Sequence, residues 1–259
     1  MAEETKPNTK YALTDIKIRI GDIVLYKIKA LIDFGDIKAG DYGGYIQSES
    51  NLGFEEDTEG NLIDYSWVYD RALVYGDATV SDNAKIEGFA SVYGNAKVYN
   101  NAIVGGTAKV YDNAEVYGDS YVLGNSKIFG DAKVHDYARV SGCARVFNNG
   151  KVYGNAQLFG EAWVYNNAEV YGNAKVYGKV QVFEDAWVYD NAVVYEDIRL
   201  FGKTSVFDNS VLFGNGWYGA EDRITFEDRV YDNTQFLSID RLNHCMLEYI
   251  DGRFYYAHP

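Results

Sequence analysis

The sequence predicts an all-β protein, a single-stranded parallel β-helix, and three observations lead to this fold class. Every sixth residue from Val68 to Leu212 is Val, Ile or Leu, at 25 consecutive positions and without an insertion. A small residue, most often Ala, stands two positions before each aliphatic residue, and Gly, Asp or Asn usually stands two positions after it. Gly and Asn at this density are poor helix formers, so a helical interpretation is excluded.

Each six-residue unit predicts a short strand followed by a corner. In Ala174-Lys175-Val176-Tyr177 the side chains alternate between the interior and the exterior of the protein, and the following residues make the corner. Asn is frequent at the third position after the aliphatic residue, and we expect it to adopt the left-handed backbone conformation there. Replacement of Asn155 by Gly is therefore expected to cost little stability.

Three such units make one triangular coil, and successive coils stack through parallel ladders. We expect about ten coils, a length of roughly 45–50 Å, and almost no helix. The aliphatic residues in the middle of the rod, including Ile128, Val134 and Val140, should all be buried.

Two segments with hairpin patterns flank the repeat, and an open coil edge would pair with other chains, so we interpret both as caps. Gly21-Asp22 joins residues 16–20 to residues 23–31, and Asp251-Gly252 joins residues 246–250 to residues 253–256. The repeat decays toward the C-terminus, where acidic residues occupy inward positions at Asp222, Asp228 and Asp240. The chain thus divides into an N-terminal β cap at 1–61, the solenoid at 62–216, and degenerate coils with a C-terminal hairpin cap at 217–259.

The composition limits the classes of partner. The net charge of −14 is spread along the chain, and such a field disfavours binding to nucleic acid or to an anionic membrane surface. The N-terminus lacks the pattern of a signal peptide, and no apolar run is long enough to span a bilayer. Cys143 and Cys245 make neither a metal-binding nor a disulfide pattern. We therefore expect a soluble cytoplasmic protein without direct nucleic-acid binding.

The unit VYGNAK at residues 170–175 resembles the hexapeptide repeat of left-handed parallel β-helices, over roughly residues 62–216. The left-handed sense of the coil is implied by this resemblance alone, since parallel crossovers are normally right-handed. Residues 33–46, DFGDIKAGDYGGYI, resemble the N-terminal part of uncharacterised bacterial and phage hexapeptide-repeat proteins labelled putative transferases. A phage or prophage origin is one interpretation of this second resemblance, and the choice between host and phage stays open.

Enzymes with this repeat include acyltransferases and carbonic anhydrases, and the resemblance raises both activities. The anhydrases of the family bind zinc through three histidines, but His135, His244 and His258 are too widely spaced to converge. We expect no metal and no cofactor. His135 occupies a position that is Tyr117 one coil earlier and Tyr153 one coil later, so we interpret it as part of an aromatic column without an orienting partner, since the adjacent Asp136 sits at a corner and adds little. A diverged acyltransferase stays as an alternative.

Aromatic residues recur at the outward position after the aliphatic residue, and residues 18 apart should lie about 4.8 Å above one another. One face predicts an eight-ring column: Tyr75, Tyr93, Tyr111, Phe129, Phe147, Tyr165, Phe183 and Phe201. A second face carries Tyr99, Tyr117, His135, Tyr153, Tyr171, Tyr189 and Phe207, and a third is continuous only over Phe159, Tyr177, Tyr195 and Phe213. Beside the eight rings run Ser91, Lys109, Lys127, Arg145, Trp163, Gln181 and Arg199.

Such columns either clamp the coils together or bind a partner, because stacked rings stabilise one another and a long exposed apolar strip usually has a use. The eight-ring column with Lys109, Lys127 and Arg145 is the predicted binding surface. Rings beside cations could hold an acidic partner, a sugar, stacked bases or a second copy of the rod. We favour a non-catalytic scaffold that binds a protein partner and possibly itself. An acidic rod that inhibits a host nucleic-acid-binding or defence protein is a further alternative.

Overall fold

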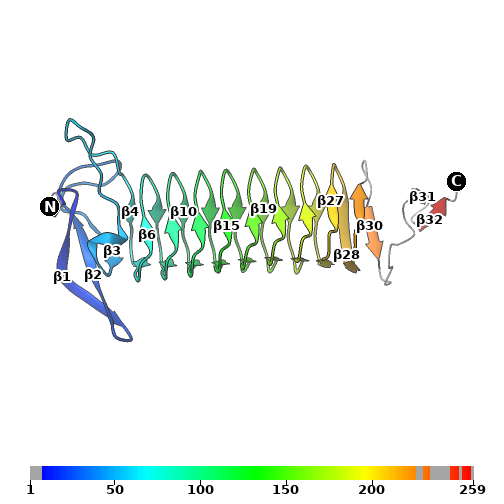
Figure 1. Ribbon diagram of the computed structural model, residues 1–259, viewed down its shortest axis with the longest axis horizontal. Coiled ribbons are helices and arrows are strands. Elements are labelled where there is room, and N and C mark those ends of the chain that lie inside the picture. The colour runs from blue at the N-terminus through cyan, green and yellow to red at the C-terminus, as the bar shows by residue number, and fades with distance from the viewer. Residues whose placement is uncertain (1–7, 226–229, 234–245, 251–252, 258–259) are drawn as a thin grey trace, which may run out of the picture.

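The fold is an all-β parallel solenoid whose coils stack along one axis (Figure 1). The computed structural model describes residues 8–225, 230–233, 246–250 and 253–257. Nine strands are stacked on one face of the rod, which gives about nine turns, close to the ten expected. The one helical element among the described residues is a short 3-10 helix, η1 (Glu49–Asn51).

Each coil contributes one strand to each of three faces, and every strand pairs in parallel with the equivalent strand of the next coil. Face 1 contains β5 (Leu73–Val74), β8 (Ser91–Val92), β11 (Lys109–Val110), β14 (Lys127–Ile128), β17 (Arg145–Val146), β20 (Trp163–Val164), β23 (Gln181–Val182) and β26 (Asp197–Leu200). Face 2 contains β6 (Thr79–Val80), β9 (Lys97–Val98), β12 (Glu115–Val116), β15 (Lys133–Val134), β18 (Lys151–Val152), β21 (Glu169–Val170), β24 (Trp187–Val188), β27 (Ser205–Phe207) and β29 (Arg223–Thr225).

Face 3 contains β4 (Trp67–Val68), β7 (Lys85–Ile86), β10 (Ile103–Val104), β13 (Tyr121–Val122), β16 (Arg139–Val140), β19 (Gln157–Leu158), β22 (Lys175–Val176), β25 (Val193–Val194), β28 (Val211–Tyr218) and β30 (Val230–Asn233). The last long strand, β28, turns the corner, because residues 211–214 pair with β30 on face 3 and residues 215–218 pair with β26 on face 1. The parallel ladder of face 1 therefore continues beyond β26 through residues 215–218.

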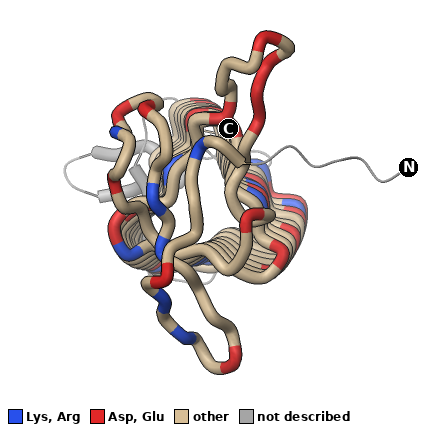
Figure 2. Tube along the Cα trace, turned by 90° about the vertical axis from the view of Figure 1, so that its left-hand side faces the viewer, with Lys and Arg blue, Asp and Glu red and all other residues tan. Residues whose placement is uncertain are grey.

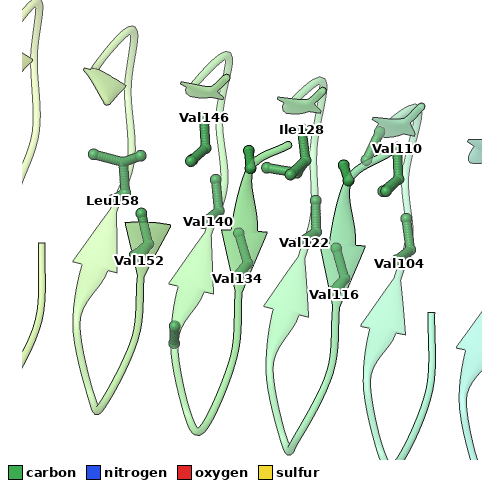
Figure 3. Packing of buried hydrophobic residues seen from close by; sticks show 14 of the residues in the cluster. Val104, Val110, Val116, Val122, Ile128, Val134, Val140, Val146, Val152 and Leu158 are labelled. Carbon is green, nitrogen blue, oxygen red and sulfur yellow. The ribbon is translucent and has the colours of Figure 1, made fainter. Parts of the chain in front are cut away.

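The core is a column of aliphatic side chains that point inward from all three faces (Figure 3). All 25 aliphatic positions of the repeat are at most 1% exposed, including Ile128, Val134 and Val140. The small residue two positions earlier is also buried, as at Ala132 and Ala138. The predicted alternation of inward and outward side chains is therefore confirmed, and the burial of each valine side chain contributes about 1.5–3 kcal/mol to stability.

The corners correct one sequence-based expectation. The left-handed backbone is adopted two positions after the aliphatic residue, as at Gly154 with φ 67° and Asp136 with φ 57°, and not at Asn155 one position later. The Asn at the third position is frequent for another reason, which is that its side-chain amide bonds to the equivalent residue of the next coil. Asn155 Nδ2 donates to Asn173 Oδ1 at 3.1 Å, and Asn173 Nδ2 donates to Asn191 Oδ1 at 2.9 Å. Gly at position 155 would therefore remove a ladder bond.

Acidic corner residues also link the coils. The carboxylate of Asp70 accepts the backbone N–H of Gly88 at 3.0 Å, and that of Asp82 accepts the N–H of Asn100 at 2.8 Å. The same bond to the equivalent corner of the next coil is made by Asp112, Asp136, Glu184 and Asp190. Figure 2 shows Asp and Glu recurring along the corners of the rod. Much of the acidity of this part of the chain thus serves the corners.

At the N-terminal end three antiparallel strands extend face 1. β1 (Tyr11–Ile20) and β2 (Ile23–Ala30) form the predicted hairpin about Gly21-Asp22, and β3 (Tyr42–Ile46) joins β2 to β5. Gly43 and Gly44 lie in β3 against the first coil, where an added Cβ would come within 2.5–2.6 Å of the backbone oxygens of residues 68 and 72. Both positions therefore require Gly.

At the C-terminal end β31 (Met246–Ile250) and β32 (Arg253–Ala257) pair as an antiparallel hairpin, as predicted. Its turn residues, 251–252, and the predicted inward acids Asp228 and Asp240 lie outside the described residues. Asp222 is buried, as expected from its inward position, and its carboxylate accepts the backbone N–H of Gly219 at 3.1 Å. The division of the chain at residues 61 and 216 stays a prediction.

A buried ion pair, which the sequence did not reveal, fastens the N-terminal segment to the first coil. Lys10 is fully buried and its Nζ lies 2.7 Å from Asp64 Oδ1, which is 4% exposed. Lys10 Nζ also donates to the Gly53 carbonyl at 2.9 Å, while Asp64 accepts the N–H of Asp82 at 2.9 Å and both the N–H and the hydroxyl of Ser66. Burial lowers the pKa of Lys10, and the Asp64 carboxylate opposes that shift.

Candidate functional site

The eight-ring column on face 1 is continuous. Its neighbouring ring centroids lie 4.7–5.6 Å apart, with interplanar angles of 1–15°. All eight rings are half-buried. Because each inner ring is covered on both flat sides by its neighbours, the part of the ring that reaches solvent is its edge. The predicted aromatic ladder is confirmed, and face 2 and face 3 carry the shorter stacks expected of them.

The tyrosine hydroxyls of the column lose their protons only at a more alkaline pH than a free tyrosine does. Burial raises the pKa of Tyr93 to about 12, and the adjoining Tyr75 and Tyr111 add to the shift. Burial likewise raises the pKa of Tyr75, Tyr111 and Tyr165. Tyrosine is neutral at neutral pH in any case, and these shifts keep the hydroxyls of the column neutral to a more alkaline pH.

A cationic stripe runs beside the eight rings, one residue before each aliphatic residue of face 1. Backbone pairing places Lys109, Lys127 and Arg145 directly above one another, followed by Trp163, Gln181, Arg199 and Trp217. Among the described residues no carboxylate forms an ion pair with any of the four cations. The predicted site residues Lys109, Lys127 and Arg145 are thus brought together, with Arg199 farther along the same stripe.

Two clusters of the same composition lie within this surface, which consists of the eight-ring column and the cationic stripe. Arg145 Cζ lies 4.9 Å from the Trp163 ring centroid, and that ring meets Phe147 edge to face at 6.3 Å. Three coils later Arg199 Cζ lies 4.6 Å from the Trp217 ring centroid, and Trp217 meets Phe201 edge to face at 6.4 Å.

Sequence reasoning did not include the tryptophans in the binding surface. The signal was the recurrence of an Arg followed, at the equivalent position of the next coil, by a Trp.

On face 2 two of the lysines form ion pairs with glutamates of adjacent coils. Lys133 Nζ lies 3.2 Å from Glu115 Oε2, and Lys151 Nζ lies 2.8 Å from Glu169 Oε1. Glu169 also accepts a hydrogen bond of 2.8 Å from the Tyr153 hydroxyl. Lys97 on face 2 and Arg139 and Lys175 on face 3 also form no ion pair among the described residues, so face 1 is distinguished by having four such cations in one ladder.

His135 lies in the face 2 column, between Tyr117 at 4.7 Å and Tyr153 at 4.9 Å, as expected. The expectation that it has no orienting partner is wrong, because its Nδ1 lies 3.1 Å from Asp136 Oδ1. This contact forms because the left-handed backbone of Asp136 turns the carboxylate back toward the preceding residue. The contact with His135 lowers the pKa of Asp136. Cys143 is an exposed free thiol.

No group of three or more His, Cys, Asp or Glu able to hold a metal ion occurs in the part of the chain that the structure describes. His244, His258 and Cys245 lie outside that part. None of the described helices has the length and apolar character needed to cross a membrane.

The chain matches no known family model. A segment of 68 residues, which is 26% of the chain, is 38% identical to the uncharacterized acetyltransferase YdcK of Escherichia coli (strain K12). The match spans 18% of the length of that relative. Together with the solenoid fold, this similarity supports a hexapeptide-repeat β-helix.

Proposed function

We propose that the protein is a non-catalytic β-solenoid scaffold that binds a protein partner through face 1. The observation that carries this proposal is the cationic stripe, in which Lys109, Lys127, Arg145 and Arg199 have no carboxylate partner among the described residues although the chain has a net charge of −14. Clamping of the coils explains the stacked rings, but it gives no reason for uncompensated cations beside them. Trp, Tyr and Arg are also the residues that most often dominate binding energy at protein interfaces.

The corner geometry counts against the acidic-rod alternative. An acidic protein that mimics nucleic acid needs its carboxylates free for a basic partner. Six of the corner carboxylates instead accept hydrogen bonds from backbone N–H groups of the next coil. These bonds supply a structural reason for six of the 38 acidic residues.

A diverged acyltransferase remains the second candidate, because His135 and Asp136 are in contact and the similar protein from Escherichia coli is named an acetyltransferase. The similarity is compatible with that activity but does not favour it over the scaffold. Both flat sides of the His135 ring are covered by tyrosines, and its side chain is 18% exposed. We expect no saturable binding of acetyl-coenzyme A by calorimetry. Binding that is lost in His135→Ala would favour the acyltransferase instead.

The scaffold proposal is tested by the double variant Phe129→Ser with Arg145→Glu on face 1. The matched control is Leu123→Ser with Arg139→Glu on face 3, where the ring column is interrupted. Sedimentation measures self-association, and proteins captured from a cell lysate are identified, purified and bound again.

We expect the face 1 variant to lose the partner while it keeps its β-type circular dichroism, and the control to retain the partner. A folded face 1 variant that keeps both the mass and the partner of the unmodified protein would contradict the proposal.

A further inference from the structure

We propose that the partner segment bound on face 1 is an extended acidic polypeptide that lies along the cationic stripe with its carboxylates against Lys109, Lys127, Arg145 and Arg199. This inference rests on the proposed scaffold function and adds the chemistry of the partner. Three observations support it: the part of each aromatic ring that is exposed to solvent, the charges of the cationic stripe and of the residues that border it, and the spacing of the two Arg–Trp–Phe clusters.

The rings of face 1 offer their edges and not their flat sides. Seven consecutive stacking contacts cover the flat sides of the inner rings, and Gly219 packs against Phe201 at the C-terminal end of the column, where an added Cβ would overlap that ring. Nucleobases are bound by stacking on exposed aromatic faces, which this column does not provide. A ring edge carries the positive end of the ring quadrupole, and it therefore attracts an anion. The ring column and the cationic stripe thus favour the same sign of ligand.

Acidic residues border the stripe at some of its coils, although Lys179 lies on the same border as Glu161 and Asp197, and the residues that flank Lys127 and Arg145 are the uncharged Asn125, Gly130, Cys143 and Asn148. Asp112 follows Tyr111 directly, Glu184 follows Phe183, and both are exposed, while Glu161 and the half-buried Asp197 lie on the opposite border. A broad acidic surface would meet these carboxylates and be repelled. A single extended chain fits between the borders. The geometry therefore favours a peptide segment over the acidic face of a globular partner.

A second copy of face 1 is a poor occupant for the same reason. A two-fold pairing of face 1 with itself presents the cations of one copy to the cations or to the positive ring edges of the other. Like charges across an interface oppose association. Self-association through this surface is therefore disfavoured, and the occupant is a different, acidic chain.

The spacing within the stripe sets the length of the segment. Lys109 and Arg199 are five coils apart, which is about 24 Å at the strand spacing, and an extended chain of about seven residues covers that distance. The clusters at Trp163 and Trp217 are three coils apart, or about 14 Å. Each holds its guanidinium against an indole, and a guanidinium fixed in this way loses less freedom when a carboxylate binds it. Arg145 and Arg199 are the expected anchors.

The test measures fluorescence anisotropy of a labelled glutamate peptide of about eight residues, the length that the stripe accommodates. A glutamine peptide of the same length controls for charge, and an oligothymidylate of the same number of units controls for nucleic acid. The variant Arg145→Gln with Arg199→Gln removes both anchors. Arg139→Gln with Lys175→Gln removes the same charge from face 3, where Arg139 also lies over an aromatic ring. Lys109→Gln with Lys127→Gln is a second face 1 variant, in case the first is not folded.

We expect saturable binding of the glutamate peptide that weakens about tenfold in either face 1 variant and changes little in the face 3 variant. Equal weakening by the face 3 variant, no binding of the glutamate peptide, or tighter binding of the oligothymidylate would each overturn the inference. If a captured protein partner is lost in Phe129→Ser/Arg145→Glu while the glutamate peptide does not bind, the scaffold proposal stands and the acidic-segment inference fails. If the face 1 variants keep both the captured protein partner and the affinity for the glutamate peptide, the scaffold proposal and the acidic-segment inference both fail.

Discussion

Replacement of Lys10 by Met tests whether the N-terminal cap depends on its buried ion pair. Lys10 is fully buried, and Met fills a similar volume without the charge. Removal of one partner of a buried ion pair costs about 3–5 kcal/mol, because the other charge is left in the interior. After the replacement Asp64 still accepts two backbone N–H groups and the Ser66 hydroxyl. We therefore expect a cost near the lower end, about 3 kcal/mol.

The loss should be confined to the cap, because a solenoid is held together by contacts between adjacent coils. Amide hydrogen exchange is the appropriate assay, since it reports the opening of individual segments. A loss of about 3 kcal/mol corresponds to exchange that is faster by a factor of about a hundred or more. We expect this acceleration at β1, β2 and β3 and no change at β14 in the middle of the rod.

A double-mutant cycle with Asp64→Asn separates the ion pair from the other contacts. If Lys10 and Asp64 act as a pair, the double variant should be less destabilised than the sum of the two single variants, by about 1–3 kcal/mol. Costs that add to within about 0.5 kcal/mol would show that the two charges act independently and would refute the reasoning. Acceleration of exchange at β14 as large as that at β3 would refute the local character of the effect.

Four further outcomes are expected. Val134→Asp should place a charge in the core and lower stability by several kcal/mol in thermal unfolding, and a loss below about 1 kcal/mol would contradict the inward assignment. Asn173→Ala should cost about 1 kcal/mol through two lost ladder bonds, and an unchanged melting temperature would show that the ladder contributes nothing. Phe147→Ala should lower stability, whereas Lys127→Glu should change it by less than about 0.5 kcal/mol. Equal losses of stability in the two variants would show that the cationic stripe stabilises the fold. Because burial raises the pKa of Tyr93 to about 12, against about 10 in the unfolded chain, stability should be full below pH 10 and fall as the pH approaches 12. A melting temperature that stays constant over this alkaline range would contradict this.

The sequence allowed the solenoid to be predicted because one local rule repeats without interruption. The spacing of six decides which side chains point inward, and the spacing of 18 decides which rings lie above one another, so the columns follow from counting. The position of the left-handed residue was assigned wrongly because Asn and Asp, which tolerate that conformation, occur at both of the two adjacent corner positions. Gly occurs only at the earlier of these positions, as at Gly154, and this restriction is the signal that separates a backbone preference there from a side-chain ladder at Asn155.

The remaining features depend on contacts that no local pattern encodes. Lys10 and Asp64 are separated by 54 positions and meet only because the N-terminal segment folds back over the first coil. The partner of His135 was missed because the contact with Asp136 depends on the backbone conformation of one corner. The lack of ion pairs at the four face 1 cations, among the residues described, could be recognised only in the structure, where two lysines of face 2 do form ion pairs.

The uninterrupted register of the coils has a consequence for how such a chain can change its length. Deletion of three consecutive repeats, which is one whole coil, preserves every inward position and every column wherever it is made, and it shortens the rod by one turn. Deletion of a single repeat, such as 149–154, also preserves the inward pattern, but it rotates all later residues by one face. The eight-ring column would then continue into the ring series of a neighbouring face, and the cations before and after the deletion would no longer share a stripe. The ring column and the cationic stripe therefore stay aligned only when repeats are lost or gained in multiples of three, whereas the core tolerates the loss or gain of any whole number of repeats.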